Sequence, residues 1–169
     1  MNTPEISTFE LFQEFSDKLV KEFDLNSKSD SELPKIITSD KRTPEDILAL
    51  FAETGNKEIL ERIACNPNTP KSVLMKLRNH KSTDVRIACA NNNKAADCVS
   101  EELAEDESLN VKFAVASNPH SSGKALNKLE DDENPYVARR ASKTLTRLEA
   151  LDKPLKKNQN VVAGKVASN

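Results

Sequence analysis

The chain has 169 residues, a formal net charge of −2, 31% charged side chains and no Trp. So small a net charge gives the molecule as a whole no general attraction to nucleic acid or to an anionic membrane. Three glycines and one tyrosine are few for the turns and strands of a sheet protein, and no apolar run approaches the roughly 18 residues that span a bilayer. We therefore expect an all-α fold without a membrane-spanning segment.

Residues 1–42 are predicted to form an N-terminal helix and a degenerate capping repeat. Between Ser7 and Asp24, Phe and Leu side chains recur at intervals of three and four residues, the spacing of one apolar helix face. This helix is expected to cover the open end of the repeat core, and the alternative is that it docks a partner. Leu33 lies 26 residues before Ile59, so the register of the repeats begins inside this segment.

The segment 43–152 is predicted to hold four repeats. Its aligned ranges are 43–68, 69–94, 95–120 and 121–146, which match without a gap. The matching columns contain Ile59, Val85, Val111 and Val137; Ala64, Ala90 and Ala116; and Asn66, Asn92 and Asn118. A fixed period of roughly 20–50 residues is typical of solenoids. The predicted fold is therefore a right-handed α-solenoid of helical-pair repeats with a 26-residue period.

Each repeat is predicted to contain two short helices. The first opens at Thr43-Pro44 and at Thr69-Pro70, because Thr is a good N-cap and Pro suits the first helical position. The second ends at a residue such as Asn66, since Asn tolerates the left-handed conformation that closes a helix. The repeated Asn could instead form a ladder for a ligand, but the helix-end interpretation explains it without one.

The end of the chain departs from this pattern. The fourth repeat lacks an Asn-Pro stop, so its second helix is expected to run on to Pro154 as a C-terminal cap. Residues 153–169 show no periodicity and include several lysines. We predict that they form a disordered basic tail.

Charge reverses sign between two neighbouring repeats. Residues 69–94 contain six basic side chains and one acidic one, whereas residues 95–120 contain one basic and six acidic side chains. These opposite charges could attract each other where the repeats stack and so help to fix their register. The alternative is that they belong to solvated helix faces.

Two segments carry a family resemblance. They are Thr83-Asp84-Val85-Arg86 with Ala90 and Asn92, and Asn110-Val111-Lys112 with Ala116, Asn118 and Pro119. This pattern resembles the leucine-rich repeat variant, which belongs with the HEAT-like α-solenoids, and the resemblance covers residues 43–147. It implies an α-helical superhelix and, in general, protein binding. One founding member carries an iron–sulfur cluster on a Cys-rich N-terminal segment, but no cysteine precedes Cys65 here, so that function is not implied.

No constellation of catalytic side chains is visible. His80 and His120 occupy different columns, so stacking of repeats would not bring them together. Cys65, Cys89 and Cys98 are odd in number and lack the C-x-x-C spacing of a zinc or redox site. Because residues 1–8 are polar, we expect no signal peptide. We therefore predict a cytoplasmic, non-enzymatic protein without catalytic residues, metal or cofactor.

The remaining candidate site is the face made by successive second helices, where solenoids bind partners. The predicted partner-binding residues are Arg86, Ile87, Lys112, Phe113, Arg139 and Arg140. Ile87 and Phe113 occupy positions near the edge of burial, and the basic side chains lie beside them. Apolar anchors with flanking Arg suit a protein or peptide partner. The alternative for the apolar pair is packing between repeats.

We expect a monomer that acts as a scaffold or adaptor for another protein. The rival function is nucleic-acid binding through the basic residues of the second helices and the tail. The acidic third repeat and the scarcity of aromatic side chains for base stacking disfavour that function. Affinity for nucleic acid would also fall steeply as the salt concentration rises, so a salt titration of binding would distinguish the two functions.

Overall fold

The computed structural model describes residues 32–54, 56–94 and 96–163, together with Glu10, Gln13, Glu14 and Asp17. Within these residues every regular element is an α-helix, which confirms the all-α prediction. The helices are α2 (Leu33–Ser39), α3 (Glu45–Thr54), α4 (Lys57–Cys65), α5 (Lys71–Leu77), α6 (Thr83–Asn91), α7 (Ala96–Leu103), α8 (Leu109–Ser117), α9 (Gly123–Glu130) and α10 (Pro135–Ala163). Of the predicted N-terminal helix, those four polar positions are helical and exposed, and its phenylalanines lie outside the described residues.

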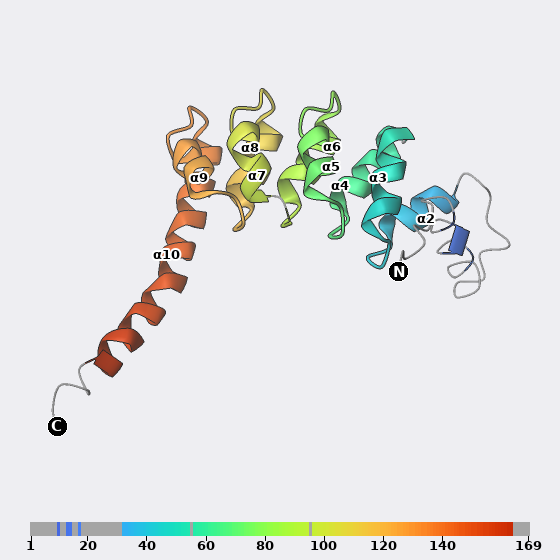
Figure 1. The fold of residues 1–169 in the computed structure, drawn as a ribbon. Helices are drawn as coiled ribbons and strands as arrows, with labels where there is room; N and C mark the ends of the chain where they lie inside the picture. The colour runs from blue at the N-terminus through green and yellow to red at the C-terminus, as the bar shows by residue number, and fades with distance from the viewer. Residues whose placement is uncertain are drawn as a thin grey trace.

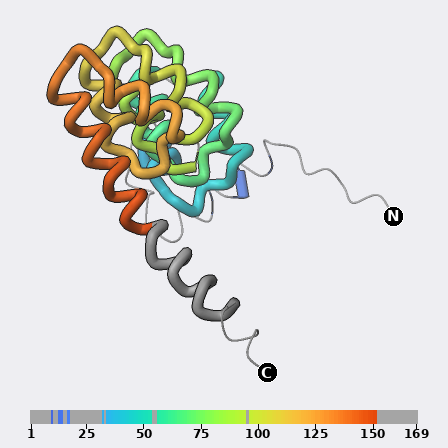
Figure 2. The backbone as a smooth tube through the Cα atoms, turned by 90° about the vertical axis from the view of Figure 1, so that its left-hand side faces the viewer, coloured from blue at the N-terminus to red at the C-terminus, as the bar shows by residue number. Residues whose placement is uncertain are grey.

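The helices form a row of pairs that follows the chain from α2 to α10 (Figure 1). We call α3, α5, α7 and α9 the first helices and α4, α6, α8 and α10 the second helices. Each first helix contacts the second helix that follows it in the chain. The second helices also contact one another in order, with α2 against α4 and α8 against α10 at the two ends (Figure 2).

The aligned apolar columns form one continuous core. Val85, Val111 and Val137 are fully or almost fully buried, one on each of three successive second helices. The small alanines at 64, 90 and 116 are buried too, and they let the backbones of neighbouring second helices approach closely. Burial of each large aliphatic side chain contributes about 1.5–3 kcal/mol to folding. The core therefore runs from pair to pair rather than closing within any one pair.

The asparagine column ends the second helices, as predicted, but by a different mechanism. Asn66, Asn92 and Asn118 are the C-cap residues of α4, α6 and α8, and each is almost fully buried. Their ψ angles of 127°, 112° and 118° are those of extended backbone, not of the left-handed conformation expected from the sequence. The extended backbone turns each side chain towards the preceding second helix.

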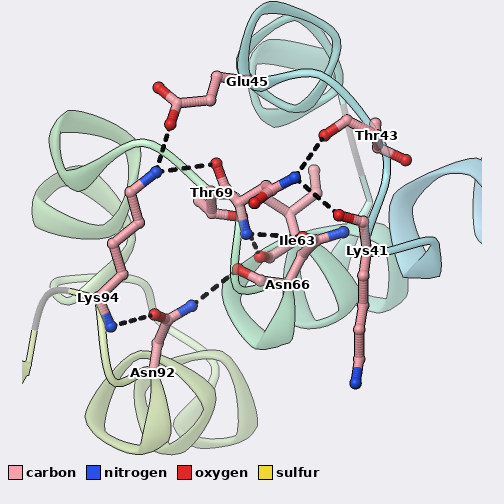
Figure 3. A network of polar contacts seen from close by, with 9 residues as sticks. Lys41, Thr43, Glu45, Ile63, Asn66, Thr69, Asn92 and Lys94 are labelled. Atoms are coloured by element: carbon pink, nitrogen blue, oxygen red, sulfur yellow. Dashed lines mark hydrogen bonds and ion pairs between the residues drawn. The ribbon is translucent and has the colours of Figure 1, made fainter.

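The side-chain amide of each of these asparagines donates hydrogen bonds to carbonyl groups of the previous pair. Asn92 Nδ2 donates to the carbonyl oxygen of Asn66 at 2.9 Å (Figure 3) and to that of Ala64 at 2.7 Å. Asn66 and Asn118 make equivalent bonds to Thr38 and Ala90. The oxygen of the same amide accepts the backbone N–H two residues later, that of Lys94 for Asn92. We call these bonds the asparagine rungs. They satisfy buried carbonyl groups where each second helix ends.

The threonines before the first helices also act differently from the prediction. Helix α5 begins at Lys71 with Pro70 as its N-cap, and no side chain caps it. The hydroxyl of Thr69 instead donates to the carbonyl oxygen of Ile63, in the last turn of the preceding helix (Figure 3). Thr43 makes the same bond to Ile37. Each hydroxyl therefore closes the helix before it, because the short turn brings that helix end within reach.

The charge reversal joins neighbouring helix pairs. Three of the basic side chains within 69–94 form salt bridges with acidic side chains within 95–120, namely Lys71–Asp97 at 3.4 Å, Arg78–Glu102 at 2.6 Å, and Arg86 with Asp106 at 2.6 Å and Glu107 at 3.7 Å. The exposed pairs contribute little to stability, because water screens them. Their regular placement still favours one register over a slipped one.

The C-terminal helix is longer than the sequence indicates. Helix α10 continues through Pro154 to Ala163 and extends away from the row (Figure 1). The prediction of disorder is therefore wrong for residues 153–163, and residues 164–169 lie outside the described part. Pro154 thus lies inside α10, although proline removes one amide donor and usually kinks or ends a helix.

Candidate interaction face

The six predicted binding residues lie on three successive second helices. Arg86 and Ile87 belong to α6, Lys112 and Phe113 to α8, and Arg139 and Arg140 to α10. The structure divides them into two groups. The first group, Arg86 and Lys112, is engaged between helix pairs, and the second group lies nearer to solvent.

Arg86 is a buried residue, with 8% of its surface exposed. Its Nε donates to Asp106 Oδ2 at 2.6 Å and its Nη2 donates to Asp106 Oδ1 at 2.9 Å. Its Nη1 also donates to the carbonyl oxygen of His80 at 3.0 Å. The hydrogen bond that the guanidinium donates to Asp106 raises its pKa. The charge of Arg86 thus serves the contact between helix pairs and is not presented to a partner.

Lys112 repeats this arrangement one pair later. Its Nζ lies 2.8 Å from Asp132 Oδ2, and Asp132 is 20 residues downstream, the same separation as between Arg86 and Asp106. The carboxylate of Asp132 is almost fully buried. Lys112 is therefore also a structural residue at this interface.

Both aspartates organise the turn in which they lie. Oδ1 of Asp106 accepts the N–H of Ser108 at 2.8 Å, and Oδ1 of Asp132 accepts that of Asn134 at 2.9 Å. Burial raises the pKa of each carboxyl, but the cation and the backbone amide outweigh that effect and hold both pKa values below the ordinary range. Each aspartate therefore remains ionised at neutral pH, as its cation requires.

Phe113 is the apolar anchor that the structure leaves in solvent. It is 45% exposed, whereas Ile87 is partly buried and packs against the core. The guanidinium of Arg140 lies over the Phe113 ring, 5.9 Å from its centroid, and its Nε donates to Ser117 Oγ at 2.9 Å. A cation–π contact of this kind contributes about 0.5–1 kcal/mol at an exposed site. Arg140 therefore joins α10 to α8 at the surface.

Two further exposed apolar side chains, which the sequence analysis did not select, accompany Phe113. Leu109 precedes it by one turn on α8, and Tyr136 precedes Arg140 by one turn on α10. Arg139 is exposed beside them. The signal was available in the sequence as the four-residue spacing on each helix. We call Ile87, Leu109, Phe113, Tyr136, Arg139 and Arg140 the apolar–basic patch.

Groups that could support catalysis or metal binding are dispersed. His80 Nδ1 accepts the N–H of Ser82 at 3.1 Å in its turn, and His120 is exposed in another turn. In the part of the chain that the structure describes, no group of three or more His, Cys, Asp or Glu side chains is placed to hold a metal ion. The described helices also include none that is long and apolar enough to cross a membrane.

Comparison with known proteins gave no match among protein-family models, curated proteins or solved structures. The function must therefore be argued from the geometry of the chain itself.

Proposed function

We propose that the chain is a right-handed α-solenoid of four 26-residue helical-pair repeats, of the HEAT-like type that the leucine-rich repeat variant represents. The ordered contacts between successive second helices support this architecture. So do the asparagine rungs, whose donors and acceptors are 26 and 28 residues apart. Helix α2 takes part in the same way, because Asn66 donates to the carbonyls of Thr38 and Asp40.

Its function is to bind another protein along the face of the second helices, as a non-enzymatic scaffold or adaptor. The exposed ring of Phe113 on a rigid helix array is the observation that carries this proposal. Interfaces concentrate their affinity in aromatic and Arg side chains near the centre of the contact. Arg139 and Arg140 supply the basic part, whereas Arg86 and Lys112 hold the array together.

Rigidity is what the array adds to this patch. The rungs and the buried pair of Arg86 with Asp106 fix neighbouring helices relative to one another. When a partner docks across α6, α8 and α10, this chain would then lose little conformational entropy. The cytoplasmic location is part of the same proposal, and the free thiols of Cys65, Cys89 and Cys98 suit a reducing compartment.

The test compares two substitutions of equally exposed apolar residues. Phe113→Asp removes the anchor of the patch, and Leu50→Asp is the matched control, since Leu50 is 42% exposed on the first helix α3. Each tagged variant and the unmodified chain are used for capture from source cells, with quantification by mass spectrometry. We expect a protein that the unmodified chain and Leu50→Asp retain and that Phe113→Asp loses, while all three keep the same helical content.

Two results would count against the proposal. Equal capture by all three forms would remove the second-helix face as the site. Recovery of nucleic acid, with an affinity that falls steeply as salt rises, would favour the nucleic-acid function instead, with the basic side chains of α10 as its contacts.

A further inference from the structure

One column of the second-helix face runs from acidic through apolar to basic. Its members, 26 residues apart, are Glu61 on α4, Ile87 on α6, Phe113 on α8 and Arg139 on α10. The same helices stack in this order, so the four side chains follow one another along the row. Read from the other end, the column is basic, apolar, apolar and acidic. Two such columns placed antiparallel would therefore oppose an acidic to a basic side chain at both ends and apolar side chains in the middle.

The acidic end of this column differs from the carboxylates near it, which are paired. Glu58 is bound by Lys35 at 2.9 Å and by Arg62 at 3.3 Å, and Asp84 is bound by Lys57 at 2.5 Å. Within the described residues, neither Glu61 nor Arg139 forms a salt bridge or a side-chain hydrogen bond. An opposite charge brought to either of them would thus gain an interaction without breaking a salt bridge or a side-chain hydrogen bond.

The acidic end also has room for a long basic side chain. A hollow of about 520 Å³ lies between the end of α2 and α4, and its lining includes Glu58, Glu61 and Cys65 together with the basic Lys41 and Arg62. At the other end, Lys143 lies one turn beyond Arg139 on α10 and is exposed. Two basic side chains one turn apart at this end therefore complement the carboxylate of Glu61, which has a hollow beside it.

We propose that the partner of the second-helix face is a second copy of this chain, docked antiparallel so that Glu61 of each copy faces Arg139 of the other. This rests on the proposed function and identifies its partner. The two-fold axis passes between α6 and α8, which places Ile87 of one copy against Phe113 of the second copy. Every contact then occurs twice, and the two-fold symmetry closes the assembly as a dimer. A dimer replaces the monomer expected from the sequence.

The test is charge reversal followed by sedimentation equilibrium of the full-length chain. Glu61→Arg and Arg139→Glu each place like charges opposite one another at both ends of the interface, and each should weaken dimerisation at least about tenfold. The double variant with both substitutions restores opposite charges and should return to within about threefold of the unmodified chain. Lys124→Glu with Glu130→Arg, a matched exchange of exposed charges on α9, should leave the dimer unchanged.

Mixing the two single variants gives a second, independent readout. A Glu61→Arg copy paired with an Arg139→Glu copy has opposite charges at both ends, so the mixture should form heterodimers although neither variant dimerises well alone. Fluorescent labels on one variant would reveal this in sedimentation velocity. The mixture also tests the geometry without the double variant, should that variant fold poorly.

Three results would overturn the antiparallel dimer. They are a chain that stays monomeric at every accessible concentration, a double variant as weak as either single one, and a mass that grows beyond the dimer. The last would indicate head-to-tail association of the acidic and basic ends. If the chain is monomeric but Phe113→Asp still loses a captured foreign protein, the dimer is wrong and the proposed function stands.

Discussion

Asn92 reaches back 28 residues to donate a 2.7 Å hydrogen bond to the carbonyl oxygen of Ala64, on the preceding second helix. The same side chain donates to Asn66 and accepts the N–H of Lys94. One amide group thus satisfies three backbone groups from two helix pairs. A buried side chain in this position joins the pairs more directly than apolar packing can, because its bonds have fixed directions.

Asn92→Ala should therefore destabilise the chain by about 3 kcal/mol, because it leaves two buried carbonyls and one amide without their partner. The measurement is urea unfolding followed by circular dichroism. Asn91→Ala is the matched control, since Asn91 is the exposed neighbour on the same helix and should change the free energy of unfolding by less than about 0.5 kcal/mol. If the two substitutions lower the free energy of unfolding by similar amounts, the hydrogen bonds of Asn92 do not contribute to stability.

Removal of one member of the buried ion pair should be costly. Asp106→Ala leaves the Arg86 guanidinium buried without its carboxylate, and we expect a loss of about 3 kcal/mol in the free energy of unfolding. Glu105→Ala, which removes the exposed neighbour that pairs with Lys128, should have almost no effect. If the two variants unfold at the same urea concentration, the pair is not a structural element.

The two aspartates of the turns should make the fold sensitive to acid. Their folded-state pKa values are lowered, so the stability that they contribute is present above the unfolded pKa of about 3.9 and is lost as the pH falls through the lower folded values. The free energy of unfolding of the unmodified chain should therefore drop below about pH 4.

Asp106→Asn with Asp132→Asn is the variant that checks this assignment. It should be less stable than the unmodified chain at pH 7, and the two stability curves should approach each other as the pH falls. The double variant cannot lose a charge at these positions, so its own curve should be flatter. Parallel curves over the whole acid range would mean that other carboxyl groups cause the pH dependence.

The three thiols should react with an alkylating reagent in a fixed order. Burial raises the pKa of Cys89 to about 12, and partial burial of the thiol, followed by the charge of Glu61, raises that of Cys65. Cys98 is exposed. At pH 8 the thiolate of Cys89 should be roughly a thousandfold scarcer than that of an ordinary thiol. Mass spectrometry of the native chain should show Cys98 modified first, then Cys65, with Cys89 protected until urea is added.

Local patterns in the sequence were sufficient to predict the helices. The predicted two helices per segment are present, and the second ones begin at Lys57, Thr83, Leu109 and Pro135. Periodic apolar residues and turn residues determine such elements from their nearest neighbours in the chain. The helical continuation past Pro154 was missed, because proline usually marks a helix end and nothing local indicates its exceptions.

Contacts between helix pairs were harder to predict, because their partners are 20 to 28 residues apart. Arg86 was assigned to the surface from its place on one helix, although the acid that buries it lies 20 residues downstream. The repetition of that separation between Lys112 and Asp132 was the available signal. The asparagine column was explained locally as a helix end, which left its bond to the previous pair unseen. Thr144, in the same column, makes the equivalent bond to Ala116 at 2.6 Å.

The unbroken course of α10 has a consequence for how many units the array can contain. In the earlier pairs the second helix stops, and its last carbonyls are left for the next asparagine. The corresponding carbonyls of Ser142 and Thr144 lie inside a continuous helix, and that of Ser142 also accepts the hydroxyl of Thr146 at 2.9 Å. A further unit grafted after residue 146 would find these carbonyls already engaged within the helix. The final helix thereby terminates growth of the array, and any engineered extension must first reinstate a helix stop after Thr144.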